Sequence, residues 1–269
     1  MLYIVATPIG NLKEITVRAI EVLKSVDCIY AENPRHSLTL LNEYEIKKSV
    51  FEYEKFSEAK KADEIIGKLK SGQNIALITD AGMPLISDPG HVLIQELIKN
   101  DLQYTVVSGA SAFVNALILS GFDTKSFTFA GFLPNRKKER QELIDNLVSL
   151  KSTLIFYLPV HDIDEGLTFL HKNLGGRCAA LVKELTKKFE SVIKFKLGQE
   201  IDIVKKGEFV LVIEGKTAVA QKDYTDIEIK KMLKDFEADG LSKTDAVKEV
   251  VKITKKDRKT VYNLSVAKK

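Results

Sequence analysis

The stretch from residue 74 to residue 90 constrains the fold more than any other part of the chain. Its first half, Asn74-Ile75-Ala76-Leu77-Ile78, is a short apolar run typical of a strand buried on both faces. Its second half, Asp80-Ala81-Gly82-Met83-Pro84-Leu85-Ile86-Ser87-Asp88-Pro89-Gly90, holds two glycines and two prolines, so the chain must turn sharply there. Open α/β sheets bind ligands at the carboxyl ends of their strands, and we therefore expect a small-molecule site here, with Asp80 and Asp88 supplying carboxylates. A plain strand-to-helix connection is the alternative.

Apolar segments of two periodicities alternate through the first 121 residues. We expect strands at 3–7, 27–31, 50–53, 75–78 and 104–108, and helices at 15–26, 57–70 (capped by Ser57), 92–99 and 113–120. Polar turns are expected at 8–11 and 32–36, directly after the first two strands. This alternation predicts a parallel sheet covered by helices on both faces.

The pattern changes near residue 122. We expect strands at 127–133, 153–158, 178–183, 190–197 and 208–214, and a helix that runs through residue 150 from the basic segment 135–140. The last three strands are too close in sequence for crossover helices, which predicts a mixed or antiparallel second sheet. The predicted organisation is thus an α/β domain at 1–121, a second α/β domain at 122–216, and a helical module at 224–269 after a polar linker at 217–223.

The helical module carries the excess positive charge of the chain. Residues 1–216 contain 28 basic and 28 acidic residues, whereas residues 217–269 contain 13 basic and 9 acidic ones. We expect three helices here, near 226–238, at 246–253 after a Ser242 cap, and near 257–267. Such a basic module suits a polyanionic partner, and a solvated lysine-rich helix face is the alternative.

The chain lacks the sequence motifs of several functional classes. No G-x-G-x-x-G follows the first strand, and neither a Walker A motif nor a G-x-S-x-G elbow occurs. The four histidines and two cysteines are too widely spaced for a zinc site, so no metal is predicted. No apolar run is long enough to span a membrane, and no signal peptide is visible. Cys28 and Cys178 sit in apolar runs, which suits the reducing cytoplasm.

Five segments in order resemble the ribosomal RNA small-subunit methyltransferase I family of the tetrapyrrole methylase superfamily. They are Leu2–Leu12 (Leu-Tyr-Ile-Val-Ala-Thr-Pro-Ile-Gly-Asn-Leu), Asp80–Gly90, Gly131–Pro134, Lys183–Lys187 and Gly207–Gly215. The resemblance covers residues 2–215 and extends into the tail, where the family carries a small helical module. It implies a two-domain tetrapyrrole-methylase-like fold, S-adenosylmethionine as cofactor, and methylation of a cytidine ribose 2′-oxygen in the RNA of the small (30S) ribosomal subunit. A cytoplasmic homodimer is also implied.

Carried onto this chain, the resemblance implies three groups of site residues. The cofactor would be bound by Pro8, Asp80, Ala81, Gly82, Met83, Pro84, Ser111, Ala112, Phe132 and Leu133. The target hydroxyl would be oriented or deprotonated by Glu32, Lys183 or Glu184, and RNA phosphates would be held by Arg35, Arg136, Lys137 and Lys187. Ser111 and Asp80 can alternatively cap local backbone, and the charged residues can form ordinary ion pairs.

The chain departs from the family pattern at several positions. Met83 replaces a usual Thr, Asn33 replaces an Asp, and Ser108-Gly109-Ala110-Ser111-Ala112 replaces a Pro-Gly-Pro-Ser-Ala turn. The run from Tyr157 to Asp162 stands where the family has an acidic, Pro, His, Arg run after the Tyr, so the family's Glu and Arg are lost there. These changes bear on the RNA substrate more than on the cofactor. Two alternatives therefore stay open, a tetrapyrrole C-methylase and a catalytically silent paralogue that binds RNA or cofactor.

Overall fold

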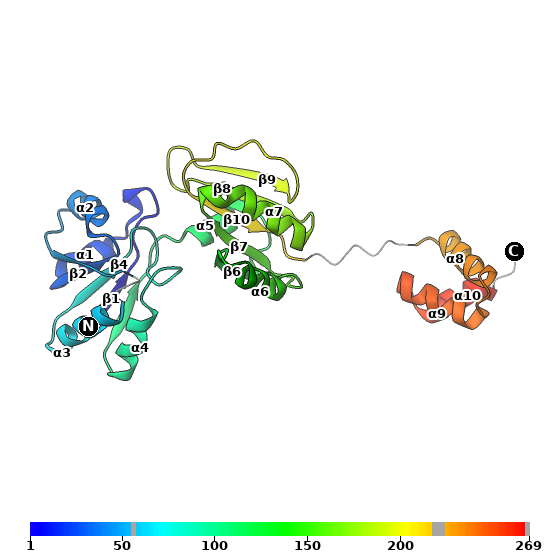
Figure 1. Ribbon diagram of the computed structural model, residues 1–269, viewed down its shortest axis with the longest axis horizontal. Coiled ribbons are helices and arrows are strands. Elements are labelled where there is room, and N and C mark those ends of the chain that lie inside the picture. Colours follow the sequence, from blue (N-terminus) through cyan, green and yellow to red (C-terminus); the bar gives the residue numbers. More distant parts are fainter. Residues whose placement is uncertain (55–57, 217–223, 267–269) are drawn as a thin grey trace. The chain divides into compact units, whose positions relative to one another are not determined.

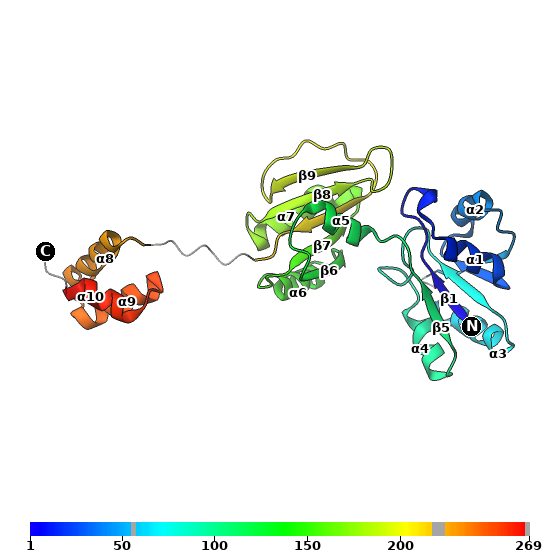
Figure 2. The same ribbon diagram turned by 180° about the vertical axis from the view of Figure 1, so that it is seen from behind.

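The computed structural model describes residues 1–54, 58–216 and 224–266. Contacts divide the chain into two compact units, Met1–Lys216 and Thr217–Lys269. The larger unit contains two five-stranded sheets, and the described part of the smaller one contains three helices (Figures 1 and 2). The further division between residues 121 and 122 stays a prediction, while the Ser57 cap and the linker at 217–223 fall outside the described residues.

The first sheet is wholly parallel, as the sequence predicts. Its strands stand in the order β3-β2-β4-β1-β5, with the bounds β1 Leu2–Val5, β2 Cys28–Ala31, β3 Ser49–Glu52, β4 Ile75–Ile78 and β5 Tyr104–Val107. Every residue of β2 and β4 is buried, because helices cover both faces of the sheet. The apolar composition of 75–78 follows from this central position.

The helices of the first sheet define where a ligand can enter. Side chains of α1 (Val17–Ser25) and α2 (Pro34–Glu43) pack on one face, and those of α3 (Glu58–Lys70) and α4 (His91–Lys99) on the other. The neighbouring strands β1 and β4 are therefore followed by helices on opposite faces. Such a switch point leaves a crevice beyond the carboxyl ends of the two strands. The predicted loop after β4 begins in this crevice.

The second sheet is mixed, which confirms the second prediction. Its strands stand in the order β6-β7-β10-β8-β9, with the bounds β6 Phe127–Phe132, β7 Thr153–Leu158, β8 Cys178–Lys183, β9 Ser191–Lys196 and β10 Phe209–Ile213. Only the β6–β7 pair is parallel. Helices α6 (Lys137–Leu147) and α7 (Ile163–Leu174) cover one face, and α5 (Ala112–Ser120) covers the other. Helix α5 thus follows a strand of the first sheet but packs against the second.

Two helices were not expected from the sequence. The predicted polar turn at 32–36 is wrong in its second part, because Pro34, Arg35 and His36 form the first turn of α2. Asn33 caps that helix, since its side-chain oxygen accepts hydrogen bonds from the backbone N–H groups of Arg35 and His36. The other unexpected helix is α7, which follows the short 3-10 turn Val160–Asp162.

The smaller unit has its own core. Helices α8 (Asp226–Ala238), α9 (Lys243–Thr254) and α10 (Arg258–Val266) bury six residues against one another: Ile229, Leu233, Ala246, Val247, Val250 and Val261. Thr225 and Ser242 cap the first two helices, and the second cap confirms the prediction. No helix among the described residues is long and apolar enough to cross a bilayer.

Candidate active site

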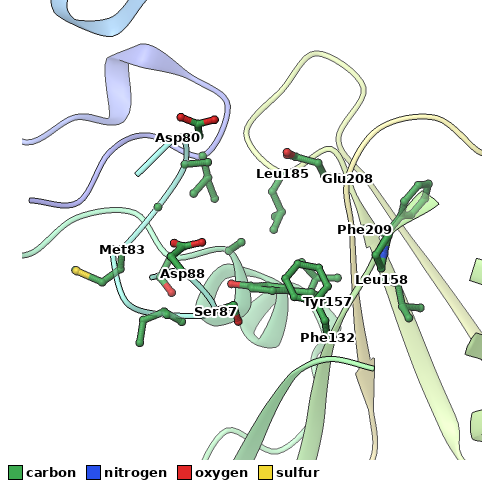
Figure 3. A pocket seen from close by; sticks show the side chains of 18 of the residues that line it. Asp80, Met83, Ser87, Asp88, Phe132, Tyr157, Leu158, Leu185, Glu208 and Phe209 are labelled. Carbon is green, nitrogen blue, oxygen red and sulfur yellow. The ribbon is translucent and has the colours of Figure 1, made fainter. Parts of the chain in front are cut away.

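A cavity of about 310 Å³ lies between the two sheets of the larger unit, at the switch point of the first sheet. This volume falls at the lower end of the range for small-molecule sites. Its lining comes from loops at strand ends: Ile9, Glu32, Asp80, Ala81, Gly82, Met83, Ile86, Ser87, Asp88, Ser111, Ala112, Phe132, Tyr157, Leu158, Pro159, Leu185, Gly207, Glu208, Phe209 and Val210. In Figure 3, Asp80 and Asp88 face Tyr157 and Leu185 across this space.

The loops that follow β1 and β4 are tied together at the floor of the cavity. Thr7 and Gly82 exchange two backbone hydrogen bonds of 2.9 and 3.1 Å, and the Thr7 hydroxyl donates to the carbonyl of Thr79. Gly82 has a φ of +80°, and a Cβ at this position would stand 3.3 Å from Cγ2 of Ile9. A side chain here would be strained and would push into Ile9, so the tight approach requires glycine.

The loop from Asp80 to Gly90 stores backbone strain where it passes the cavity. Leu85 and Ser87 have φ values of +72° and +70°, in the left-handed region that L side chains rarely adopt. Residues held in this way persist only where the surrounding structure determines them, and they concentrate at ligand sites. Asp88 points into the cavity (Figure 3), and Ile86 also lines the cavity while staying 39% exposed.

Three carboxylates give this wall of the cavity its charge. Burial and the negative charges of Glu32 and Asp80 raise the pKa of Asp88 to about 7, against an opposing hydrogen bond from Thr79. Burial and Asp80 also raise the pKa of Glu32. The buried Oδ1 atom of Asp80 accepts no hydrogen bond from the described residues, and Nδ1 of His36 lies 3.6 Å away. These groups form an anionic surface that is incompletely paired within the protein.

The opposite wall is aromatic. Tyr157 stands in edge contact with Phe129 at a centroid distance of 4.9 Å and lies 5.2 Å from Phe132. Burial raises the pKa of Tyr157 to about 12, although a hydrogen bond from the backbone N–H of Phe113 opposes this, so the phenol stays protonated. Figure 3 shows its hydroxyl pointing toward Asp88. The aromatic part of this wall therefore offers shape and a hydroxyl, while its acidic residue, Glu208, is paired with Lys187.

A closed turn after β8 carries Leu185 into the cavity. Oε1 of Glu184 accepts hydrogen bonds from the backbone N–H of Glu208 at 2.9 Å and from Nζ of Lys187 at 3.0 Å. Nζ of Lys187 also contacts Oε2 of Glu208 at 2.9 Å. Glu184 and Thr186 both have left-handed backbone conformations. The charged groups of this turn thus pair with one another and fix the position of the cavity wall.

The structure brings eight of the predicted site residues together on the cavity: Glu32, Asp80, Ala81, Gly82, Met83, Ser111, Ala112 and Phe132. Pro84 and Leu133 adjoin two of these residues in the chain, and Pro8 adjoins the lining residue Ile9, but none of the three lines the cavity. The amino group of Lys183 donates to the carbonyl of Val204, and Glu184 and Lys187 are engaged as described above. Arg35 begins α2, while Arg136 and Lys137 lie at the start of α6, away from the cavity lining.

Other lining residues were not predicted as site residues. Asp88 was expected to supply a carboxylate to the ligand but was not among the site residues that the resemblance implies, and its proximity to Glu32 required the fold to be known. Tyr157, Leu185 and Glu208 come from three strand ends of the second sheet. The sequence carried one usable signal for them, since Leu185 and Glu208 lie inside segments that resemble the family.

A family model described as Tetrapyrrole (Corrin/Porphyrin) Methylases matches residues 1–200. The chain is 36% identical over 270 residues to the ribosomal RNA small subunit methyltransferase I of Halalkalibacterium halodurans, covering 98% of this chain and 93% of that relative. It is 37% identical to the protein of the same name from a Synechocystis species, over 99% and 97% of the two chains.

Two solved structures share the fold at low identity. A diphthine synthase superimposes with a TM-score of 0.65 at 16% identity, over 80% of this chain and 90% of that one. A uroporphyrin-III-C-methyltransferase from Thermus thermophilus superimposes with a TM-score of 0.56 at 18% identity, over 79% and 93% of the two chains. These likenesses show the fold alone.

Proposed function

The chain belongs to the ribosomal RNA small subunit methyltransferase I family of the tetrapyrrole methylases, and from this premise we propose the reaction that it catalyses. It is an S-adenosylmethionine-dependent methyltransferase that acts on the ribose 2′-oxygen of a cytidine in small-subunit ribosomal RNA. The observation that carries the RNA substrate is the extent of the likeness. The Halalkalibacterium relative is 36% identical over 98% of the chain, whereas the uroporphyrin methyltransferase structure is 18% identical over 79%.

The residues of the cavity fit the cofactor. S-adenosylmethionine supplies a methyl group on a positively charged sulfur. The carboxylates of Glu32, Asp80 and Asp88 suit a cation, and Oδ1 of Asp80 is buried without a hydrogen-bond donor from the described residues. Gly82 lets backbone come close, and Ser111 begins α5, whose amino-terminal N–H groups favour a carboxylate. Met83, Ala112 and Phe132 supply apolar surface, and Pro8, Ala81, Pro84 and Leu133 are proposed to shape the loops.

Glu32 is the best placed of the proposed catalytic residues. It lines the cavity, and its raised pKa makes the carboxylate a better proton acceptor for a ribose hydroxyl. For Lys183 and Glu184 we propose a supporting role rather than proton transfer. Their charged groups are held by Val204, Lys187 and Glu208, which supports a role in fixing the wall opposite Glu32. Orientation of the hydroxyl can contribute several orders of magnitude to the rate.

Basic residues in both units are proposed to hold the RNA. Arg35 flanks the acidic wall, Arg136 and Lys137 begin α6, and Lys187 lies in the turn beside the cavity. Residues from Lys243 onward add nine basic and three acidic side chains. Their attraction to phosphates would be independent of sequence and would fall steeply with salt. An RNA affinity that does not respond to salt would remove this role.

We further propose that the protein works as a homodimer in the cytoplasm, where ribosomal subunits are its substrate. The edge strand β5 supports the homodimer, since Tyr104 and Val106 are 39% and 48% exposed there. Unpaired apolar edges are commonly covered by a partner. Sedimentation equilibrium tests the dimer, and a monomer at micromolar concentration would contradict it.

The proposed reaction is tested with labelled S-adenosylmethionine and unmethylated small ribosomal subunits. Digestion and mass spectrometry then locate the label on base or ribose. Label on one cytidine ribose, reduced at least tenfold in Glu32→Gln, is the expected result. Label on a base, label on a tetrapyrrole precursor only, or cofactor binding without any transfer would each overturn it.

A further inference from the structure

Phe189 is an aromatic side chain with no place in the core. It is 70% exposed, more than any other aromatic residue in the described ranges. The turn that carries it also carries Leu185, which is 7% exposed and lines the cavity. One short segment therefore presents an apolar residue to the cavity and, four positions later, an aromatic ring to solvent.

The position of Phe189 is fixed by a dense set of contacts. The backbone N–H of Thr186 donates to Oε2 of Glu190 at 2.6 Å, and the N–H of Glu190 donates to the carbonyl of Lys187 at 3.1 Å. The N–H of Lys187 donates to the carbonyl of Glu184 at 3.0 Å. Bonds on both sides of Phe189 thus close the turn. The backbone that carries the ring is therefore already ordered, which lowers the entropy cost of binding a partner there.

One lysine lies beside the ring, and others lie on the neighbouring loop. Nζ of Lys188 lies 5.6 Å from the Phe189 ring centroid. The neighbouring loop between β9 and β10 contributes Lys206, and its Val204 carbonyl is held by Lys183 at the end of β8. Within the part of the chain that the structure describes, neither Lys188 nor Lys206 forms an ion pair. These two cations stay available for an anionic partner.

We propose that Phe189 is a stacking platform for an unpaired base of the RNA substrate, next to the nucleotide that enters the cavity, with Lys188 and Lys206 contacting its phosphates. This inference rests on the RNA substrate proposed above. Bases outside a helix expose flat faces that stack on aromatic rings, while lysines contact the backbone. The same turn reaches into the cavity through Leu185, so the stacked base and the target nucleotide would belong to one short single-stranded segment.

Charge favours RNA over a protein partner at this position. A protein-docking site on this turn would be expected to combine several exposed apolar side chains and few lysines. Here the ring lies between Lys188 and Glu190 in the chain, and Glu190 is hydrogen-bonded to the backbone N–H of Thr186. The next exposed apolar residue, Val204, is followed by Lys205 and Lys206. An exposed ring with unpaired lysines on its own turn and on the neighbouring loop suits a base and its phosphates.

The test uses two substitutions that distinguish stacking on the aromatic face from general apolar contact. Phe189→Leu keeps an apolar side chain and removes the aromatic face, whereas Phe189→Tyr keeps the face. Binding of the full-length protein to a fluorescent single-stranded oligoribonucleotide and to its duplex is measured by anisotropy. We expect Phe189→Leu to weaken single-strand binding about tenfold with duplex binding unchanged, and Phe189→Tyr to stay within about twofold of wild type. Phe127→Leu, at a 44% exposed ring on β6 that has no role in the proposed site, is the matched control.

Cofactor affinity and melting temperature decide whether the effect is structural. Both should be unchanged in Phe189→Leu, and a fall in either would overturn the proposal. Equal loss on single strand and duplex, or weaker binding to intact subunits but not to protein-free RNA, would also overturn it, the latter in favour of a ribosomal protein. Binding is measured without methyl transfer. A wild-type protein that binds through Phe189 but labels no RNA would therefore contradict the proposed function alone.

Discussion

The two walls of the cavity differ in chemistry and in construction. The wall from the first sheet is acidic, and most of it comes from the single loop between Asp80 and Asp88, with Glu32 beside it. The wall from the second sheet is aromatic and apolar, and it comes from scattered strand ends at Phe132, Tyr157, Leu185 and Phe209. One wall supplies charge through one strained loop, and the other supplies shape through many separate contacts.

This difference indicates how each wall responds to change. A loop with left-handed residues depends on every backbone position, so single substitutions there should have large effects. In a wall assembled from several strands, many side chains contribute to packing and binding. Each single substitution there should therefore have a smaller and more local effect. Substitutions in the acidic wall test this difference, and their expected effects decrease in the order Gly82, Asp80, Asp88.

Gly82→Ala should be the most damaging change, lowering the free energy of unfolding by about 3 kcal/mol. An Ala in the left-handed region costs about 1–2 kcal/mol, and a Cβ 3.3 Å from Ile9 adds crowding at a buried position. Urea denaturation measures the loss. Gly72→Ala is the control, because Gly72 has a φ of +88° but no atom lies within 4 Å of the position that its Cβ would take. If both variants lose the same amount, crowding at Ile9 has no role.

Asp80→Ala should weaken S-adenosylmethionine binding about thirtyfold, which corresponds to about 2 kcal/mol, a typical value for a hydrogen bond to a charged group. The reason is that Oδ1 of Asp80 is buried and lacks a hydrogen-bond donor among the described residues. Isothermal titration calorimetry gives the affinity, and Asp63→Ala on the exposed side of α3 is the control. Unchanged affinity would mean that Asp80 only supports the loop.

Asp88→Asn should change stability by less, about 1–2 kcal/mol, and in a pH-dependent way. The folded pKa of about 7 exceeds the ordinary value of 3.8, so the folded state holds a proton that the unfolded state releases. Stability from this group is therefore full below about pH 4 and is lost as the pH rises to about 7. Solvent contact of the carboxyl reduces the effect below its formal size.

The substitution removes this loss, so Asp88→Asn should melt at a higher temperature than wild type at pH 8, while the difference vanishes at pH 4. Thermal scans across pH 4–8 measure it. A constant difference between the two proteins at every pH would show that Asp88 has an ordinary pKa.

Much of the fold follows from local patterns. The apolar runs at 28–31 and 75–78 belong to strands buried on both faces, and the short spacing after Cys178 leaves only antiparallel pairing. Helix α2 was missed because Asn33 and Pro34 belong equally to turns and to helix starts, and only the surrounding sheet decides between them. Helix α7 contains Gly166, which weakens its helical pattern.

The site was predicted unevenly for the same reason. The loop from Asp80 to Pro84 is continuous in sequence, so its glycine, proline and aspartate predict a ligand site from local composition alone. Tyr157 and Glu208 reach the cavity from strands paired across the second sheet, and no local pattern links them to Asp88. Lys187 was predicted to contact phosphates, yet its amino group lies between Glu184 and Glu208, a pairing that requires two distant loops to meet.

Helix α5 has a consequence for synthesis of the chain. It follows β5, but the apolar surface that it covers belongs to β7, β8 and β10, and β10 ends only at Ile213. While a ribosome extends the chain from residue 120 to residue 213, the sheet that α5 covers is incomplete, so Ala116 and Leu117 stay partly exposed to water. Nascent chains halted in this window should attract chaperones that bind apolar helices, and release should coincide with the emergence of β10.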